Sequence, residues 1–258
     1  MSGLNAGELR GEFGRLVAAT QRHLELEESF GVERMPFDAS RAAALREQHR
    51  ASARAPSGAP NKAAALAALE SELQPCNLCG LGAGRTKLVF GAGNPDADLM
   101  LIGEAPGYHE DRKGIPFIGP AGQLLTKIIE AIGLTRDQVY IGNVCKCRPP
   151  NNRTPRPDES AACFPFLRQQ IEIIQPRIIV ALGNPAMKAL LDTRQGITRM
   201  RGRFVEWNGI EVMPTFHPSY LLRNPAAKRD VWDDMKKVWT RMREMGLTVG
   251  KLKGGKDS

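Results

Sequence analysis

Short apolar runs alternate with amphipathic stretches of helical period from about position 73 onward. The apolar runs are Asp98–Gly103, Val139–Val144, Arg177–Leu182 and Glu211–Phe216. The helical patterns lie between and after them, around 121–132, 158–174, 184–192 and 228–245. Aliphatic and β-branched runs separated by helices are typical of a mostly parallel sheet that is covered on both faces. We therefore predict an α/β fold with three α/β/α layers around a small, mostly parallel sheet.

The N-terminal part of the chain has a different pattern. Six residues recur there at helical spacing: Leu9, Phe13, Leu16, Val17, Thr20 and Leu24. They predict a helical extension whose apolar face packs either on this protein or on a protein partner. Residues 51–60 are small, polar and Pro-containing, which is typical of a linker. An Ala-rich helix with Asn61 as its N-cap is predicted to follow.

These patterns divide the chain into three parts. We expect a helical extension and linker at 1–60, a folded domain at 61–245 and a basic, flexible tail at 246–258. The 258 residues are 42% hydrophobic and 25% charged, which excludes a wholly disordered or fibrous protein. No window reaches the ~18 uninterrupted apolar residues of a spanning helix, and the N-terminus lacks a signal segment. We expect a cytoplasmic protein without membrane association.

The charge is uneven along the chain. The formal net charge is +8, yet residues 1–60 balance eight Arg against eight Asp and Glu. Subtracting these from the 36 basic and 28 acidic residues leaves 28 basic and 20 acidic residues in 61–258. A basic domain of this kind fits a polyanionic partner such as nucleic acid, or simply a solvated basic surface. Charge alone does not choose between them.

Four of the five cysteines form a candidate ligand set. Cys76 and Cys79 make a C-x2-C pair, and Cys147 and Cys163 supply two more thiols. Thiolate-only ligation suits zinc or an iron–sulfur cluster, and the spacing does not separate the two. A redox C-x2-C pair is the alternative, but it leaves the second pair of cysteines unexplained. Cys145, inside an apolar run, is expected to be a buried thiol.

The segments that follow the apolar runs are candidate site segments, because ligands of parallel sheets bind beyond the carboxyl ends of the strands. The first is GEAPGYHED at 103–111, which places Glu104, Glu110 and Asp111 close together. Crowding raises the pKa of at least one carboxyl group and suits water activation or electrostatic stabilisation. A solvated acidic loop is the alternative.

Further along the chain, Phe117 stands between two glycines, where it is either a core residue or a stacking platform. Asn143 near the next strand end offers both a donor and an acceptor, or simply completes a turn. Arg148 and Arg153 nearby suit phosphate groups.

The last segment is HPSYLLR at 217–223. His217 directly follows an apolar run and precedes a proline, which places it to donate a hydrogen bond to a ligand, although a structural histidine is the alternative. The Tyr-Leu-Leu stretch before Arg223 is an apolar tip of the kind that enters a base stack.

Six motifs taken together, in this order, resemble the iron–sulfur (family 4) uracil-DNA glycosylases. They are CNLC at 76–79, GEAPGYHED at 103–111, GIPFIGPAGQLL at 114–125, NVCKCRPPNNRTP at 143–155, Cys163, and HPSYLLR at 217–223. The match covers roughly 73–245 and leaves 1–70 and the Lys-rich tail unexplained. The resemblance implies a uracil-DNA glycosylase-like catalytic domain at 61–245.

The resemblance also implies an activity and a cofactor. The activity is DNA repair by hydrolysis of the N-glycosidic bond of uracil in single- or double-stranded DNA, which leaves an abasic site. The cofactor is a [4Fe–4S] cluster on Cys76, Cys79, Cys147 and Cys163. The base must leave the stack to be reached, and poorly paired uracil costs least to extrude.

Individual roles follow from the same resemblance. Phe117 would stack on the uracil, Asn143 would contact its N3/O4 edge, and His217 would donate to O2 of the leaving anion. Backbone N–H groups around Ala105 and Gly107 would line the pocket. Residues 218–221 would fill the gap left by the extruded nucleotide. On this interpretation the DNA contacts come from Ser219, Tyr220, Leu221 and Arg223.

The carboxylates are implied to act on water and on the sugar cation. Glu104 and Glu110 would do so, with Asp111 as a helper, and Glu110 would exclude thymine by bulk beside C5. Better-known uracil glycosylases place an Asp where this chain has Ala105, so the role on water is not fixed to one carboxylate.

The alternative function is a non-catalytic or product-trapping uracil-DNA-binding module that releases no free uracil. The uracil-trapping relatives insert a basic, His-containing segment before the last cysteine. Residues 148–162 contain no His, which favours turnover.

Overall fold

The computed structural model describes residues 61–252. The expected N-terminal helix and linker therefore lie outside the described residues. Six strands form one sheet in the order β1-β3-β2-β4-β6-β5. Their bounds are Ala92–Gly93 (β1), Leu99–Gly103 (β2), Tyr140–Asn143 (β3), Ile178–Leu182 (β4), Val205–Trp207 (β5) and Ile210–Thr215 (β6). The four predicted apolar runs are β2, β3, β4 and β6, which pair in parallel.

The two edge strands were not predicted. β1 and β5 pair antiparallel to their neighbours and are two and three residues long. Such short edges carry too few residues for an alternating pattern to show.

Helices connect the strands. The α-helices are α3 (Lys62–Leu73), α4 (Tyr108–Lys113), α5 (Pro120–Ala131), α6 (Pro157–Ile174), α7 (Asn184–Leu191), α8 (Ile197–Met200), α9 (Pro218–Arg223) and α10 (Lys228–Glu244). Short 3-10 turns lie at Gly82–Gly84, Arg136–Gln138, Pro150–Asn152 and Pro225–Ala227. As predicted, Asn61 caps α3, with its side chain accepting a hydrogen bond from the amide of Ala64.

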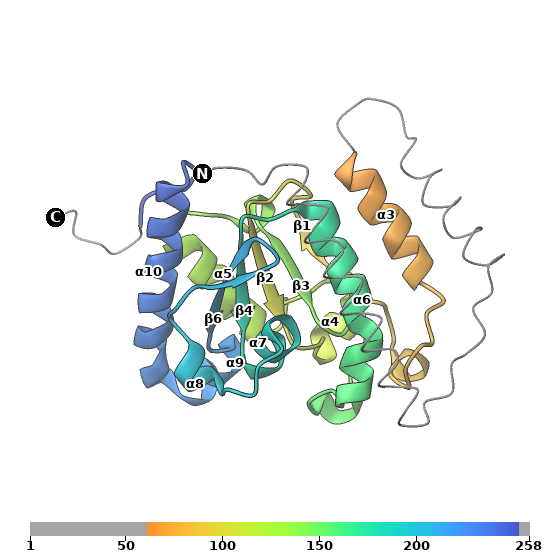
Figure 1. The fold of residues 1–258 in the computed structure, drawn as a ribbon. Coiled ribbons are helices and arrows are strands. Elements are labelled where there is room, and N and C mark those ends of the chain that lie inside the picture. Colours follow the sequence, from red (N-terminus) through yellow and green to blue (C-terminus); the bar gives the residue numbers. More distant parts are fainter. Residues whose placement is uncertain (1–60, 253–258) are drawn as a thin grey trace, which may run out of the picture. The chain divides into compact units, whose positions relative to one another are not determined.

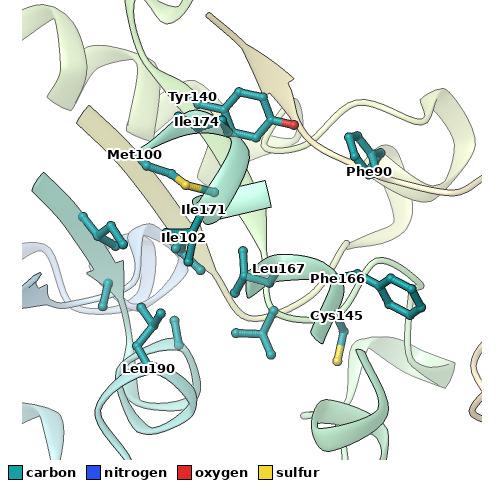
Figure 2. Close-up of a cluster of buried hydrophobic side chains, with 14 of the residues drawn as sticks. Phe90, Met100, Ile102, Tyr140, Cys145, Phe166, Leu167, Ile171, Ile174 and Leu190 are labelled. Carbon is teal, nitrogen blue, oxygen red and sulfur yellow. The ribbon is translucent and has the colours of Figure 1, made fainter. Parts of the chain in front are cut away.

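Alternation along the strands separates two buried layers, one on each face of the sheet (Figure 1). Met100 and Ile102 of β2 face α3, α6 and α7, whereas Leu99 and Leu101 face α5 and α10. Figure 2 shows the first layer, in which Leu167, Ile171 and other α6 side chains lie over β2. The predicted three-layer α/β/α architecture is confirmed.

The C-terminal boundary differs from the prediction. The indole Nε1 of Trp239 donates to the carbonyl of Gly250 (2.8 Å), and the amide of Gly250 donates to the carbonyl of Gly133 (3.1 Å). Leu247, Val249 and Leu252 pack against the α5–α10 layer. Residues 246–252 therefore belong to the domain, because their apolar side chains are covered by it, and the predicted boundary after residue 245 is wrong.

The topology marks one edge of the sheet for ligands. From β2 the chain proceeds to β3 on one side and then crosses to β4 on the other side of β2. The strand order thus reverses at β2, and ligands of such sheets bind beyond the carboxyl ends of the strands at this point. No helix among the described residues is long and apolar enough to cross a membrane.

Candidate active site

A cavity of about 400 Å³ lies at the carboxyl edge of the sheet. It is bordered by the segment after β2, the end of β3, the segment after β6, the loop before α5 and the loop before α6. Ten residues singled out from the sequence line it: Glu104, Ala105, Gly107, Glu110, Phe117, Asn143, Arg153, His217, Ser219 and Arg223. Segments far apart in the chain therefore meet in one place. Asp111, Tyr220 and Leu221 do not line the cavity.

Asn143 is the most buried polar group of this cavity. It ends β3 opposite Gly103 of β2, and only 1% of it is exposed. Its Oδ1 is the one buried side-chain oxygen or nitrogen in the described part of the chain that lacks a hydrogen-bond partner. A buried polar atom left without a partner costs about 1–3 kcal/mol. This cost would be relieved by a hydrogen-bond donor that enters the cavity, such as a ligand N–H group.

Gly103 makes room for the neighbours of Asn143. A Cβ atom at this position would collide with both Asn143 Oδ1 and the ring of Phe117. The absence of a side chain at the end of β2 therefore lets an amide and an aromatic ring approach each other at the base of the cavity.

Phe117 is buried and has a left-handed backbone, with φ at 53°. A residue other than glycine in this region costs about 1–3 kcal/mol, and such strain is concentrated at functional sites. Its ring lies 5.5 Å from the imidazole of His217, at an interplanar angle of 36°. The two rings thus border the same space from different segments.

The hydrogen bonds of His217 define its tautomer. Its Nδ1 accepts from the amide of Ser219 (3.1 Å) and lies 2.8 Å from the Ser219 hydroxyl. Burial lowers the pKa of His217 to about 4, and the charge of Arg223 adds to this effect. At neutral pH the ring is therefore uncharged and carries its proton on Nε2, which is free to donate to a ligand.

The three carboxylates have different surroundings. Burial raises the pKa of Glu104, and a hydrogen bond with Thr154 opposes the shift. Glu110 Oε1 accepts from the amides of Ile118 and Gly119, both at 2.9 Å. Asp111 instead accepts from the amide of Thr86 (2.8 Å) and lies outside the cavity lining. Of the three carboxylates, Glu104 accepts no hydrogen bond from a backbone amide of the described residues. Asp111 is buried, and its contact with Thr86 supports the fold.

Residues 218–223 form helix α9, which corrects the predicted apolar tip. Pro218 and Leu221 lie on one helix face and are buried, Leu221 to 1% exposure, so Leu221 packs in the core and cannot enter a base stack. The exposed members are Tyr220 and Leu222, at 37% and 48%. The six-residue helix was too short to show a helical period in the sequence.

The cavity lining also contains residues that the sequence analysis did not single out as site residues. Pro106, Ala121, Pro149, Asn152 and Thr154 complete the lining. Their only signal was their place inside the motifs at 103–111, 114–125 and 143–155.

Two arginines of the loop before α6 have different surroundings, and of the two only Arg153 lines the cavity. The guanidinium of Arg153 binds both oxygens of Glu159 at 2.8 and 2.7 Å. Arg148 donates to Asn152 (2.7 Å) and lies over the ring of Tyr108. Of the two expected phosphate contacts, Arg153 is thus already paired with a carboxylate.

Four cysteines border a second, smaller cavity. Cys76, Cys79, Cys147 and Cys163 line it together with apolar side chains. Arg85 donates to Cys147 Sγ and the amide of Lys146 donates to Cys163 Sγ, each at 3.3 Å. Cys145 is buried outside this lining, as predicted for a core thiol.

The four cysteines do not form a cage for a single ion. The described residues hold no group of three or more His, Cys, Asp or Glu side chains arranged to bind one metal ion. Four thiols around one cavity are a donor set that both zinc and iron–sulfur clusters take.

The chain was compared with known families and proteins. The Uracil DNA glycosylase superfamily matches residues 90–239. A type-4 uracil-DNA glycosylase of Thermotoga maritima is 47% identical over 182 residues, which cover 69% of this chain and 95% of that protein. The corresponding protein of Sulfurisphaera tokodaii is 45% identical over 192 residues, covering 71% of this chain and 86% of that protein.

A more distant relative is a type-5 uracil-DNA glycosylase of Pyrobaculum aerophilum, 36% identical over 146 residues. It covers 50% of this chain and 64% of that protein. The superfamily match spans the sheet and nearly all of the cavity-lining segments, and the type-4 relatives extend over most of their own length. The chain therefore belongs to the uracil DNA glycosylase superfamily, in its type-4 branch.

Proposed function

We propose that this protein removes uracil from DNA by hydrolysing the N-glycosidic bond and leaves an abasic site. The unpartnered, buried Oδ1 of Asn143 carries this proposal, because it requires a donor such as the N3–H of uracil. The names of the type-4 relatives support the same activity.

The cavity suits one extruded pyrimidine. A base must leave the duplex stack before its glycosidic bond can be reached. The ring of Phe117 provides a stacking surface, while Asn143 accepts from N3–H through Oδ1 and donates to O4 through Nδ2. Neutral cytosine lacks the N3 proton and carries an amino group in place of O4, so this amide discriminates against it.

Bond cleavage separates charge. As the C1′–N1 bond breaks, its electron pair leaves on the base and the sugar becomes oxocarbenium-like. The Nε2–H of His217 donates to O2, where negative charge develops. A donor preorganised in this way contributes about 2.7–4 kcal/mol in comparable sites.

Glu104 is the group we assign to the water molecule. Its carboxylate accepts a proton as the water oxygen adds to C1′. Glu110 contributes negative charge near the sugar cation, and its bulk beside C5 of the base excludes thymine. Asp111 supports the fold at Thr86 and is not assigned a step.

The DNA surface extends from the cavity mouth. Tyr220 and Leu222 would fill the gap left by the extruded nucleotide, and Arg223 and Arg148 would contact phosphates. Ser219, which hydrogen-bonds with His217, would contact the substrate beside it. Backbone N–H groups at Ala105 and Gly107 would face the base.

We further propose that Cys76, Cys79, Cys147 and Cys163 hold a [4Fe–4S] cluster. When bound, the cluster supplies a covalent clamp that joins the loop after α3, the loop after β3 and helix α6. None of the five cysteines forms a disulfide, which is consistent with a reducing compartment, and we place the protein in the cytoplasm. A protein partner for residues 1–60 stays a prediction.

The direct test incubates the purified, cluster-containing protein with an oligonucleotide that carries one uracil, followed by alkali. We expect strand cleavage and release of free uracil, and no cleavage of matched oligonucleotides that carry thymine or cytosine. DNA binding without release of free uracil would instead establish the non-catalytic or product-trapping alternative.

A further inference from the structure

The loop before α5 holds Phe117 in an unusual backbone conformation. Its φ of 53° is left-handed, a region that aromatic residues rarely adopt. A Cβ atom at Gly122 would collide with the carbonyl of Phe117, so the glycine lets α5 begin close to this peptide group. Two charged side chains from outside the loop bind it in this conformation.

Arg136 binds the loop from one side. It lies in the 3-10 turn between α5 and β3, and its guanidinium donates to the carbonyls of Pro116 (2.8 Å) and Phe117 (3.1 Å). A third contact, to the hydroxyl of Thr126 at 3.3 Å, ties the same guanidinium to α5.

Glu110 binds the loop from the other side. Its Oε1 accepts from the amides of Ile118 and Gly119, the two residues after Phe117. Burial lowers the pKa of Arg136, while the charges of Asp137 and Glu110 raise it, so the two clamp residues attract each other across the loop. The four loop residues 116–119 are therefore each held by a charged side chain.

We propose that Arg136 is a positioning residue that keeps the Phe117 ring in place to stack on the extruded base. A planar guanidinium can donate to two neighbouring carbonyls at once, which a single ammonium group does less well. Arg136 does not line the cavity and acts through Phe117. This inference rests on the proposed function, because the base is the partner of the ring.

The test is a double-mutant cycle of Arg136→Met and Phe117→Ala, measured as single-turnover uracil release. A misplaced reacting group can cost about 10²-fold, so we expect Arg136→Met alone to lower the rate roughly 10- to 100-fold. In the Phe117→Ala background the same change should add less than about 3-fold, because the ring that Arg136 positions is gone. Affinity for uracil-free DNA should stay unchanged.

Arg241→Met is the matched control. Arg241→Met likewise removes guanidinium hydrogen bonds, here to Glu211 at the opposite end of β6 from the cavity. The Arg241→Met variant should release uracil at the rate of the unmodified protein. If Arg136→Met fails to fold, Arg136→Lys is the second variant. We expect it to lower the rate of uracil release by a smaller factor, and this loss should again depend on Phe117.

Amide hydrogen exchange gives a readout that does not require activity. We expect faster exchange in a peptide covering 115–121 in Arg136→Met than in Arg241→Met. An unchanged exchange rate, or a rate loss that adds fully to that of Phe117→Ala, would overturn the assignment. If the unmodified protein released no uracil, the proposed function would fail and the exchange comparison alone would decide whether Arg136 holds the loop.

Discussion

Two residues at the cavity have features that are uncommon in folded proteins. Asn143 keeps an oxygen without a partner, and Phe117 takes a left-handed backbone. Each departure costs free energy that a close-packed sheet has to offset. Such exceptions are expected at functional sites, where the surrounding structure holds a group ready for a ligand.

The surroundings of Glu104 predict the pH dependence of the reaction. Its carboxylate must be ionised to accept a proton from water, and burial raises its pKa. Single-turnover uracil release should therefore rise with pH through a midpoint above the ordinary glutamate value and then stay level. His217, with a pKa of about 4, stays neutral over this range and adds no second limb near its ordinary value.

Glu104→Gln is the comparison for this profile. It should be slower and should lose the acidic limb, since the titrating group is removed. A profile of the unmodified protein that bends near pH 6.5, the ordinary histidine value, and that survives Glu104→Gln would contradict the assignment of both groups.

The elements of the fold were predictable in proportion to their length. The four central strands and the helices from α5 to α7 and α10 follow from apolar runs and helical periods of sufficient length. Four short elements could not be predicted in this way, because a segment of a few residues is too short to show a period. They are β1, β5, α8 and α9. The missed α9 had a consequence: as a helix it turns Leu221 into the core and exposes Leu222 in its place.

The four proposed cluster ligands lie on the loop after α3, the loop after β3 and helix α6, and this arrangement gives a prediction about how the elements are held together. Cys147→Ala should lose the brown colour of an iron–sulfur protein and unfold more easily, because ligation is coupled to folding. Cys145→Ala is the comparison variant and should keep the colour, since this buried thiol hydrogen-bonds with Cys163 but lies outside the cavity of the four cysteines. Visible absorbance and thermal unfolding measure both effects. A coloured, stable Cys147→Ala protein would remove this residue from the ligand set.

At the scale of the whole molecule, the sheet brings together residues that are far apart in sequence. Gly103 ends β2, Asn143 ends β3, and His217 follows β6 on the far side of β4. The sequence motifs predicted that these segments share a site, since all follow strands of one parallel sheet. They did not predict which carboxylate lacks backbone donors, because the amides that bind Glu110 and Asp111 come from other segments.

The excess of basic over acidic residues in 61–258 is also a property of the whole molecule. Sequence counts showed the excess but not its position. The structure places Arg153 and Arg223 in the cavity lining, where Arg153 is paired with Glu159, whereas Arg148 lies outside the lining and over the ring of Tyr108. Side-chain pairing of this kind depends on tertiary contacts that no local pattern records.

The most direct test of the account measures single-turnover uracil release and DNA affinity in parallel for His217→Ala. The control is His109→Ala, which changes an exposed histidine outside the cavity lining. The account predicts that His217→Ala slows release by about 10²-fold or more, the loss expected for an oxyanion donor, with affinity unchanged and with His109→Ala as fast as the unmodified protein. Release by His217→Ala at the unmodified rate would show that the cavity does not stabilise the leaving uracil.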